Sequence, residues 1–293
     1  MGQARVAEFE AERSWLLGIA YRMLGEVQEA EDAVQDAYLR WTAADRSDIE
    51  SPRAWLTKAV TNLCLNRLTS AQARRETYPG PWLPEPVLTG PAALTLGPLE
   101  TVEQRDTVSL ALLTLMERLT PAERAVFVLR EAFGYPHREI SQILDISDPA
   151  SRKLHHRARQ RVGEPHPRYD TDPGQVRRLV ERFLAATLHG DLAGLADLLA
   201  QDVTSWSDGG GKARAARRPV HGRDKVARLV VALAGNADTG INLVVEEVNG
   251  GPGIIGRMEE TVVIVVAIEV GSGQITALHS VLNPDKLSQA THK

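Results

Sequence analysis

The sequence has one cysteine, no long apolar run and no excess of positive charge, and each shortage excludes a class of protein. A single thiol, Cys64, cannot form a disulfide within the chain, which fits a protein of a reducing compartment. The N-terminus is acidic and polar, so we expect no secretory signal and a cytoplasmic location. The longest apolar run, from Val262 to Ile268, is too short to span a bilayer, and its β-branched residues favour a buried strand.

Positive charge is not in excess over the whole chain, since its 293 residues sum to a net charge of −4. A protein that coats nucleic acid unaided is usually basic, so any DNA binding here needs a local basic patch or a partner. The eight histidines are scattered and form no metal-ligand pattern, and no residue repeat is visible. We therefore expect no metal and no cofactor. The length predicts two or three domains, each with ample core.

Basic charge gathers in the stretch 135–162, YPHREISQILDISDPASRKLHHRARQRV. We expect a short helix over 138–144 with three apolar side chains at helical spacing, followed by a tight turn. Ser147 is a suitable N-cap for a second, basic helix, and Pro149 is tolerated in its first turn. Two short helices, a tight turn and a basic second helix suit DNA reading in the major groove. On this stretch alone, an ordinary helical hairpin with a solvated basic face is the alternative.

Two N-terminal stretches predict helices with functional faces. In 26–41 an apolar face is opposed by Glu and Asp side chains, with no basic residue before Arg40. Taken alone, this stretch favours a plain soluble helix, and the functional alternative is an acidic docking surface for a basic partner. In 51–75, Ser51 caps a helix whose outer face and end carry Asn and Arg, which suit base edges and phosphates. Cys64 lies in the apolar part of this helix and is expected to be an inert buried thiol.

The remainder divides into linkers and two folded parts. The stretch 76–104 is rich in Pro and Gly without a period, which predicts a linker, and its Trp82 and Leu83 should dock on another apolar surface. Helices resume over 105–134, where Thr120, Pro121 and Glu123 predict a capping box. After a second linker the pattern changes to helices and then a curved antiparallel sheet, which predicts an α+β cone with a pocket. Its last strands are expected near 241–248, 254–259, 261–270 and 274–282.

With these pieces in order, the chain resembles a bacterial extracytoplasmic-function (ECF) sigma factor over essentially its whole length. EAEDAVQDAYLRW at 29–41 is similar to the helix by which such factors grip core RNA polymerase. SPRAWLTKAVTNLCLNRL at 51–68 is similar to the segment that melts and reads the minus-ten promoter element. LTPAERAVFVLREAFGYPHREISQIL at 119–144, with the basic helix after it, resembles the domain that reads the minus-thirty-five element.

Three further signatures resemble the subgroup of these factors that carries a C-terminal SnoaL-like domain. They are YPGPWLPEP at 78–86, DGGGK at 208–212 and NPDKL at 283–287. From its residues alone, DGGGK is better explained as a simple hairpin turn. The sequence departs from the family at the helix-turn-helix, where Asp145 replaces the usual glycine and Pro149 stands where Glu or Ala is more usual. Asp tolerates the left-handed conformation better than most residues.

The resemblance implies a multidomain fold, with two all-α sigma domains followed by an α+β SnoaL/NTF2-like cone. Residues 1–76 would form sigma region 2, which binds polymerase and the minus-ten element. A Pro/Gly-rich linker would occupy 77–105. Residues 106–166 would form sigma region 4, with the helix-turn-helix that reads the minus-thirty-five element, and 167–293 would form the regulatory domain.

The implied site residues fall into three groups. Those expected at DNA are Asn62, Asn66, Arg67, Arg74, Arg75, Ser151, Arg152, Lys153, His156, Arg157 and Arg159. Those expected at RNA polymerase are Glu31, Asp32, Gln35, Asp36, Leu39 and Trp41. Those expected in interdomain regulation are Trp82, Leu83, Asp208, Gly209, Gly210, Gly211, Lys212, Asn283, Pro284, Asp285, Lys286 and Leu287.

The leading hypothesis is an alternative sigma factor that works with core RNA polymerase and promoter DNA, as a monomer without a catalytic site. Its C-terminal domain would regulate it by packing on the sigma domains through the three signatures. The second hypothesis is an enzyme that uses Asp202, Asp208 or His221 as a base. However, the sequence shows no acid and base paired at a spacing that indicates catalysis. The third hypothesis, compatible with the first, is a sensor that binds a small molecule in the cone.

Overall fold

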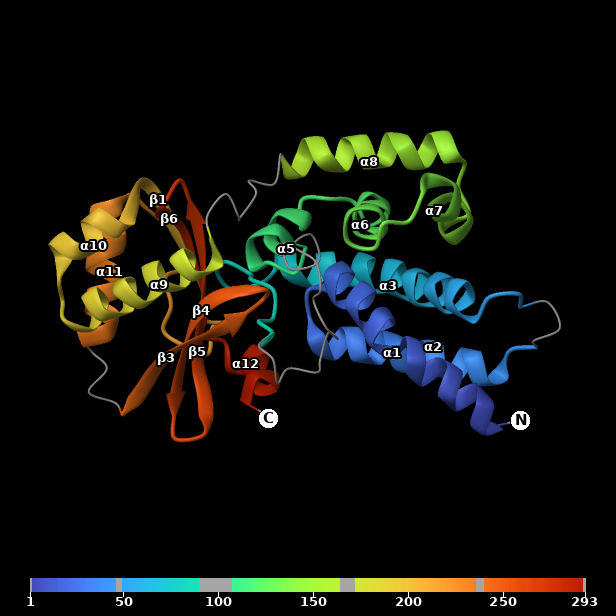
Figure 1. Ribbon diagram of the computed structural model, residues 1–293, viewed down its shortest axis with the longest axis horizontal. Coiled ribbons are helices and arrows are strands. Elements are labelled where there is room, and N and C mark those ends of the chain that lie inside the picture. The colour runs from blue at the N-terminus through green and yellow to red at the C-terminus, as the bar shows by residue number, and fades with distance from the viewer. Residues whose placement is uncertain (1, 46–48, 90–106, 164–171, 236–239, 292–293) are drawn as a thin grey trace. The chain divides into compact units, whose positions relative to one another are not determined.

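The computed structural model describes residues 2–45, 49–89, 107–163, 172–235 and 240–291 (Figure 1). The chain divides into two compact units. The first contains 1–77, 93–108 and 112–164, and the second contains 78–92, 109–111 and 165–293. Part of the predicted linker therefore belongs to the C-terminal unit. Among the described residues, no helix is both long and apolar enough to cross a membrane.

The first unit is helical, and α3, α6 and α8 begin at the polar caps that the sequence predicts. Its elements are α1 (Gly2–Leu24), α2 (Val27–Ala43), α3 (Pro52–Glu76), most of α5 (Leu110–Met116), α6 (Pro121–Phe127), the π-helical turn η1 (Val128–Ala132), α7 (His137–Leu144) and α8 (Asp148–Val162). Ser51 accepts a hydrogen bond from the N–H of Ala54, and Thr120 and Glu123 form the predicted capping box. The helical stretch expected over 105–134 restarts at Pro121 as predicted, and its described part forms three short pieces, α5, α6 and η1.

The interior of the first unit is built from the apolar faces of its helices. Helices α1, α2 and α3 pack against one another, and α6 packs against α8. Trp41 and Trp55 lie with ring centroids 5.5 Å apart, and Phe9 and Tyr38 lie 4.9 Å apart. Cys64 is fully buried, and burial raises the pKa of its thiol to about 12, so the sulfur is an inert part of the core.

The second unit is an α+β domain around one six-stranded sheet. Its elements are α9 (Pro173–Leu188), α10 (Leu192–Leu198), β1 (Leu199–Asp208), β2 (Val220–His221), α11 (Arg223–Gly235), β3 (Ile241–Val248), β4 (Gly251–Met258), β5 (Thr261–Gly271), β6 (Gln274–Val281) and α12 (Pro284–Thr291). The strand order is β2-β1-β6-β5-β4-β3, and among the strand pairs of the described residues only β1–β6 is parallel. The sheet and the helices that precede it form the α+β arrangement, helices first and then a sheet, that the sequence predicts.

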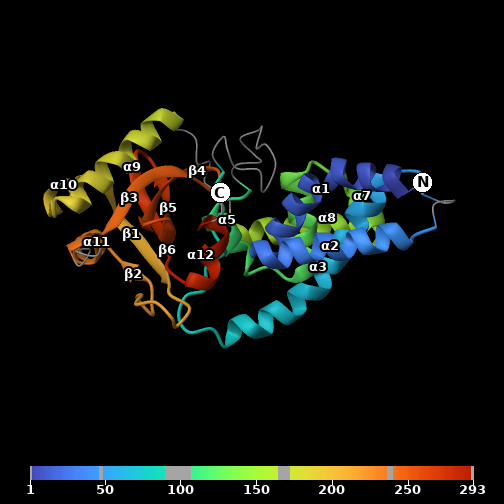
Figure 2. The same ribbon diagram turned by 90° about the horizontal axis from the view of Figure 1, so that it is seen from below.

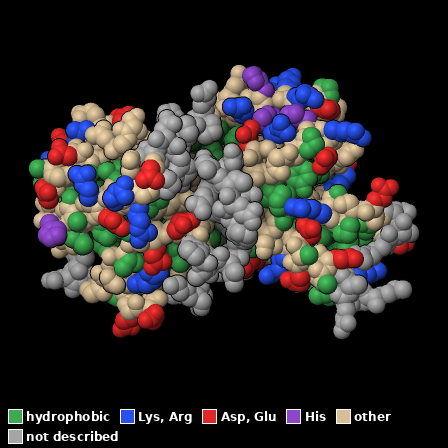
Figure 3. Space-filling model, in the orientation of Figure 1, with side chains coloured by type: hydrophobic (Ala, Val, Ile, Leu, Met, Phe, Trp, Pro, Cys, Tyr) green, Lys and Arg blue, Asp and Glu red, His purple; other side chains and the backbone are tan. Residues whose placement is uncertain are grey.

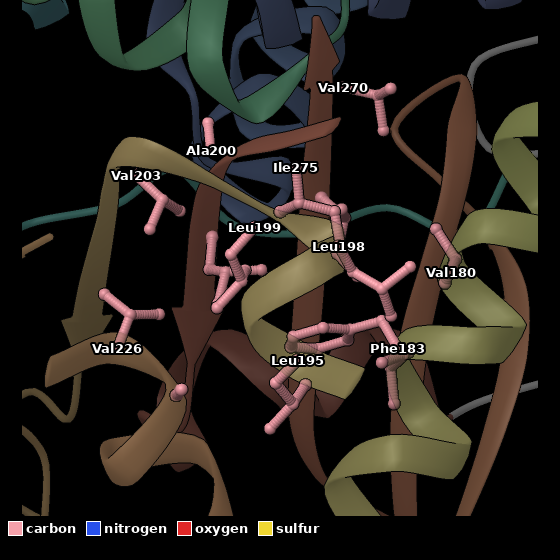
Figure 4. Close-up of a cluster of buried hydrophobic side chains, with 14 of the residues drawn as sticks. Val180, Phe183, Leu195, Leu198, Leu199, Ala200, Val203, Val226, Val270 and Ile275 are labelled. Atoms are coloured by element: carbon pink, nitrogen blue, oxygen red, sulfur yellow. The ribbon is translucent and has the colours of Figure 1, made fainter. Parts of the chain in front are cut away.

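Two apolar clusters stabilise this sheet. One fills the space between the sheet and α9, α10 and α11, and it includes Val180, Phe183, Leu195 and Val226 (Figure 4). The other includes Leu83 of the predicted linker together with residues of β3–β6 and α12. Burying each such side chain contributes about 1.5–3 kcal/mol. The linker segment is thus an integral part of the second core and does not hang free in solvent.

Candidate functional site

Helix α8 presents the basic surface predicted to read DNA. Its N-cap Ser147 accepts a hydrogen bond of 3.3 Å from the N–H of Ala150, with Pro149 in the first turn as expected. The preceding turn residue, Asp145, adopts a left-handed conformation with φ of 53°. Lys, Arg and His side chains gather over α8 in Figure 3. Five of the predicted DNA contacts are exposed there: Arg152, Lys153, His156, Arg157 and Arg159.

Two other residues of α8 face inward and hold the helix in place. Ser151 is fully buried, and its hydroxyl shares a hydrogen bond of 2.9 Å with Nδ1 of His137 on α7. His155 pairs with Glu131 of η1 at 2.6 Å, and this hydrogen bond lowers the pKa of the Glu131 carboxyl. Ser151, which the sequence places among the DNA contacts, therefore lies in the packing between α7 and α8 and not on the exposed basic surface.

Helix α3 is different because its main predicted DNA-binding arginine is already paired with acids. The guanidinium of Arg67 donates to Glu29 at 3.1 Å and to Asp36 at 2.7 Å, and it lies 4.0 Å from Asp32, all three on α2. Burial acts to lower the pKa of Arg67, but the hydrogen bonds with Asp36 and Glu29 outweigh it and raise the pKa. Two of the predicted polymerase contacts and one predicted DNA contact thus form one ion cluster. On the same helix Asn66 is exposed and Asn62 is half-buried.

Helix α2 offers a surface that is mainly acidic and polar. Asp32, Gln35 and Leu39 are exposed, and Glu31 is partly exposed. Trp41 is fully buried, and its Nε1 donates a 3.1 Å hydrogen bond to the backbone carbonyl of Arg5. The Trp41 side chain consequently stabilises the packing of α2 in the first unit and offers no surface to a partner in this conformation.

The end of α3 carries a partly buried ion network. Arg75 donates to the carbonyl of Leu24 at 2.6 Å and to Glu26 at 3.1 Å, and it also pairs with Glu117. Glu117 pairs in turn with the fully buried Arg124. Arg75 therefore links α3 to the helical region that follows the linker, although the sequence places it at DNA. The side chain of Arg74, a further predicted DNA contact, lies outside the described part of the structure.

Direct contacts join the two halves of the first unit. Lys58 of α3 donates to Asp145 at 2.6 Å and to the carbonyl of Gln142 at 3.1 Å, so it caps the turn of the helix-turn-helix. Trp15 of α1 packs edge-on against Phe133 with ring centroids 4.7 Å apart. In this conformation, the helix predicted to read one promoter element touches the turn before the helix predicted to read the other.

In the second unit the three sequence signatures meet around Asp208. Its carboxylate, fully buried at the end of β1, accepts hydrogen bonds from the Tyr78 hydroxyl at 2.6 Å and from the N–H of Leu83 at 2.9 Å. Lys286 pairs with it at 2.8 Å, donates to the carbonyl of Leu83, and lies 4.2 Å from the ring centroid of Trp82. We call these groups the Asp208–Lys286 cluster. It holds the backbone of the linker at both an N–H and a C=O.

The DGGGK loop is shaped to fit this cluster. Gly210 has a φ of 59°, and a Cβ there would lie 2.4 Å from the side chain of Asn283. Asn283 in turn donates to the Tyr78 hydroxyl at 2.9 Å. Lys212 extends outward and pairs with Asp285 at 2.6 Å, so DGGGK and NPDKL are joined by a second, exposed ion pair. DGGGK is therefore a turn that also makes specific contacts, and its glycines are needed for close approach.

The linker continues along the edge of the sheet after the cluster. Asn249, in the β3–β4 turn, accepts a 2.9 Å hydrogen bond from the N–H of Val87 through its side chain and donates from its backbone to the carbonyl of Val87 at 2.8 Å. Leu88 forms a bridge with Val248, and Thr89 donates to Glu247 at 3.0 Å. In Figure 2 this teal segment runs past α12. Residues 78–89 are thus bound along their length.

Of the three candidate catalytic bases, two are exposed and the third is buried and already bound. Asp202 and His221 are exposed, and His221 shares a 3.1 Å hydrogen bond with Thr204. Asp208 is occupied by the linker and Lys286. Within the described residues, no group of His, Cys, Asp and Glu side chains is arranged to hold a metal. A small molecule in the cone remains a prediction.

Comparison with known proteins agrees with this arrangement. Residues 9–74 match Sigma-70 region 2, and residues 109–162 match Sigma-70, region 4. The chain is 41% identical over 294 residues to the ECF RNA polymerase sigma factor SigJ of Mycobacterium tuberculosis, covering 97% of this chain and 93% of that protein. It is 33% identical over 287 residues to the probable ECF RNA polymerase sigma factor SigI of the same species, covering 96% of this chain and 94% of the relative.

The likeness extends to the three-dimensional structure. The crystal structure of the Mycobacterium tuberculosis SigJ protein matches with a TM-score of 0.77 at 37% identity, covering 97% of this chain and 98% of that one. The chain belongs to the ECF sigma factors. As an alternative sigma factor it acts with RNA polymerase at promoter DNA to start transcription, and α1–α3 and α5–α8 supply its sigma regions 2 and 4.

Several residues of this sigma factor were not found from the sequence. Tyr78 of the linker binds Asp208, and Asn249 binds the backbone of the linker at Val87. Lys58 joins regions 2 and 4. The only sequence signals were the position of Tyr78 in the linker signature and the Asn-Gly pair at the β3–β4 turn. Neither signal identifies its partner, because the contacts join residues far apart in the chain.

Proposed function

We propose that the C-terminal domain regulates this sigma factor by binding the linker between regions 2 and 4. The observation that carries the proposal is the buried Asp208–Lys286 pair, which holds both backbone groups of Leu83. A buried carboxylate and ammonium are tolerated only when fully hydrogen-bonded. The linker completes that hydrogen bonding, so docking of the linker and integrity of the cluster depend on each other.

Docking of the linker shortens the free connection between regions 2 and 4, which supports a regulatory role. Residues 78–89 are bound to the C-terminal unit, and an extended chain spans about 3.3–3.6 Å per residue. Docking therefore removes roughly 40 Å of contour length from the connection between regions 2 and 4. Release of the segment would return that length to the connection.

The length matters because the two promoter elements are far apart. The positions minus ten and minus thirty-five differ by 25 base pairs, or roughly 85 Å at about 3.4 Å per base pair. Regions 2 and 4 touch in this conformation through Lys58–Asp145 and Trp15–Phe133. Regions 2 and 4 therefore cannot bind the minus-ten and minus-thirty-five elements at the same time while these contacts persist. We infer that this is a closed form, which opens when polymerase and promoter are engaged.

The proposal assigns surfaces to partners. DNA reading falls to the exposed side chains of α8 and to Asn66 on α3. Polymerase binding falls to Glu31, Asp32, Gln35 and Leu39 on α2. Arg67 and Asp36 would reach separate partners only after their mutual ion pair opens. We further propose that the C-terminal domain is non-catalytic, because Asp208 is committed to the linker and the other candidate bases are exposed.

Runoff transcription with purified core polymerase on a cognate promoter tests the regulatory proposal. Trp82→Ala removes the ring beneath Lys286 and should raise the yield, because it weakens linker docking. The control is Lys212→Met, which changes only the exposed pair and should leave the yield unchanged. A chain ending near Pro167 provides a second comparison. Equal yields from the wild type, the Trp82 variant and the shortened chain would refute the regulatory role.

A further inference from the structure

The C-terminal domain contains a cluster of basic residues, most of which make no contact with the linker in the described structure. Residues 212–228, KARAARRPVHGRDKVAR, contain seven Lys or Arg residues and one Asp. The segment therefore carries a formal charge of +6 in a chain whose net charge is −4, so all other residues together sum to −10. Among these basic residues, Lys212 is paired with Asp285.

Three arginines in the loop between β1 and β2 stand apart from the rest. Arg214, Arg217 and Arg218 are exposed, and in the described structure none of them forms an ion pair or a side-chain hydrogen bond. Two exposed arginines of α9 in the same domain lie beside acids. Arg177 pairs with Glu181 at 3.0 Å, and Arg178 lies 3.8 Å from Asp172. The loop is thus a local excess of guanidinium groups without internal counter-charge.

The backbone that carries these arginines is held in a defined shape. The carbonyl of Gly209 accepts hydrogen bonds from the N–H groups of Lys212 and Ala213, both at 2.9 Å. A Cβ on Gly209 would lie 2.4 Å from the carbonyl oxygen of Ala213, so glycine is required there. A loop fixed at its base loses less conformational entropy on binding than a free one.

We propose that this arginine loop, residues 214–218, binds the phosphate backbone of duplex DNA. The guanidinium fork matches phosphate oxygens, and Arg is favoured over Lys for such contacts. A sigma factor operates on promoter DNA, so a polyanion is present whenever it functions. The C-terminal domain thereby supplies a third, sequence-independent DNA contact besides regions 2 and 4. The contact uses none of the side chains that hold the linker.

The experiment measures binding of the full chain to a fluorescent DNA duplex of arbitrary sequence between 50 and 200 mM salt. Each phosphate contact contributes about 0.9 to the slope of log affinity against log salt. R217A/R218A should lower the slope by about 1.8, so the ratio of wild-type to variant affinity falls about 12-fold across this range. R217K/R218K keeps the charge and should keep most of the wild-type slope.

The matched control is R177A/R178A, which removes the same charge from an adjacent arginine pair in the same domain. Because those arginines are paired with acids, their loss should change the slope little. Equal slope changes in the two alanine variants would overturn the proposal in favour of a general charge effect. An unchanged slope in R217A/R218A, with weaker binding to core polymerase alone, would also overturn it and assign the loop to an acidic protein surface.

Discussion

Two ion pairs join the DGGGK and NPDKL motifs, and they lie in opposite environments. Asp208–Lys286 has a separation of 2.8 Å with side chains that are 0% and 9% exposed, whereas Lys212–Asp285 has a separation of 2.6 Å with side chains 57% and 62% exposed. The chemistry and distance are nearly the same, so the surroundings decide their importance. The buried pair organises the linker backbone, and water competes with the exposed pair.

The largest expected effect comes from breaking the buried pair on one side. Lys286→Met leaves the Asp208 carboxylate buried without its counter-charge and should destabilise the C-terminal unit by about 3–5 kcal/mol. Urea unfolding of the full chain, followed by the far-UV circular dichroism of the sheet and by tryptophan fluorescence, measures this loss. A loss below about 1 kcal/mol would show that the cluster is hydrated in solution.

Tyr78→Phe should have the next largest effect. It removes the hydroxyl that donates to Asp208 at 2.6 Å, a hydrogen bond to a charged group that contributes about 1.5–3 kcal/mol. Burial and the hydrogen bond to Asp208 raise the pKa of Tyr78. The unfolded chain loses the phenol proton first, so this part of the stability is complete below the ordinary tyrosine pKa of about 10 and is lost as pH rises toward the folded value.

The pH dependence offers a check that is separate from the loss of stability itself. Urea unfolding at pH 8 and above pH 10 should show a steeper fall for the wild type than for the Tyr78→Phe chain. Parallel pH profiles for the two proteins would contradict a specific Tyr78–Asp208 hydrogen bond.

Gly210→Ala should cost about 1–3 kcal/mol, because a non-glycine residue is strained at φ of 59° and its Cβ would strike Asn283. The control is Gly235→Ala at the end of α11, where φ is ordinary and no atom lies within 4 Å of the added Cβ. That change should stabilise the protein by about 0.4–1 kcal/mol. Thermal unfolding of both variants provides the measurement, and equal shifts in Tm would refute the close-approach argument.

The smallest effect is expected at the exposed pair. Lys212→Met should change the free energy of unfolding by no more than about 1 kcal/mol, and the change should shrink further in high salt. Urea unfolding at low and high salt measures it. A loss as large as that of Lys286→Met would mean that the two pairs act as one network.

A second contrast, between α8 and α3, shows how far sequence reasoning reached in the sigma domains. Both helices carry arginines at positions that suit DNA, and in α8 those side chains are exposed. In α3, Arg67 is bound by acids of α2, and Arg75 is bound by Glu26 and Glu117. The difference could not be predicted because the acids lie about 30 to 50 positions away and approach only when the helices pack.

The sequence by itself determined the family, the order of the domains and the ends of most helices. Ser51, Thr120, Ser147 and Asp145 act within three or four residues of themselves, so their caps and turns could be read directly. Only the tertiary structure decided which charges are available and which are paired. Tyr78 and Asp208 are 130 positions apart, and Leu83 and Lys286 are 203 apart. A buried charge is held by whatever the fold brings beside it, and no local rule specifies that partner.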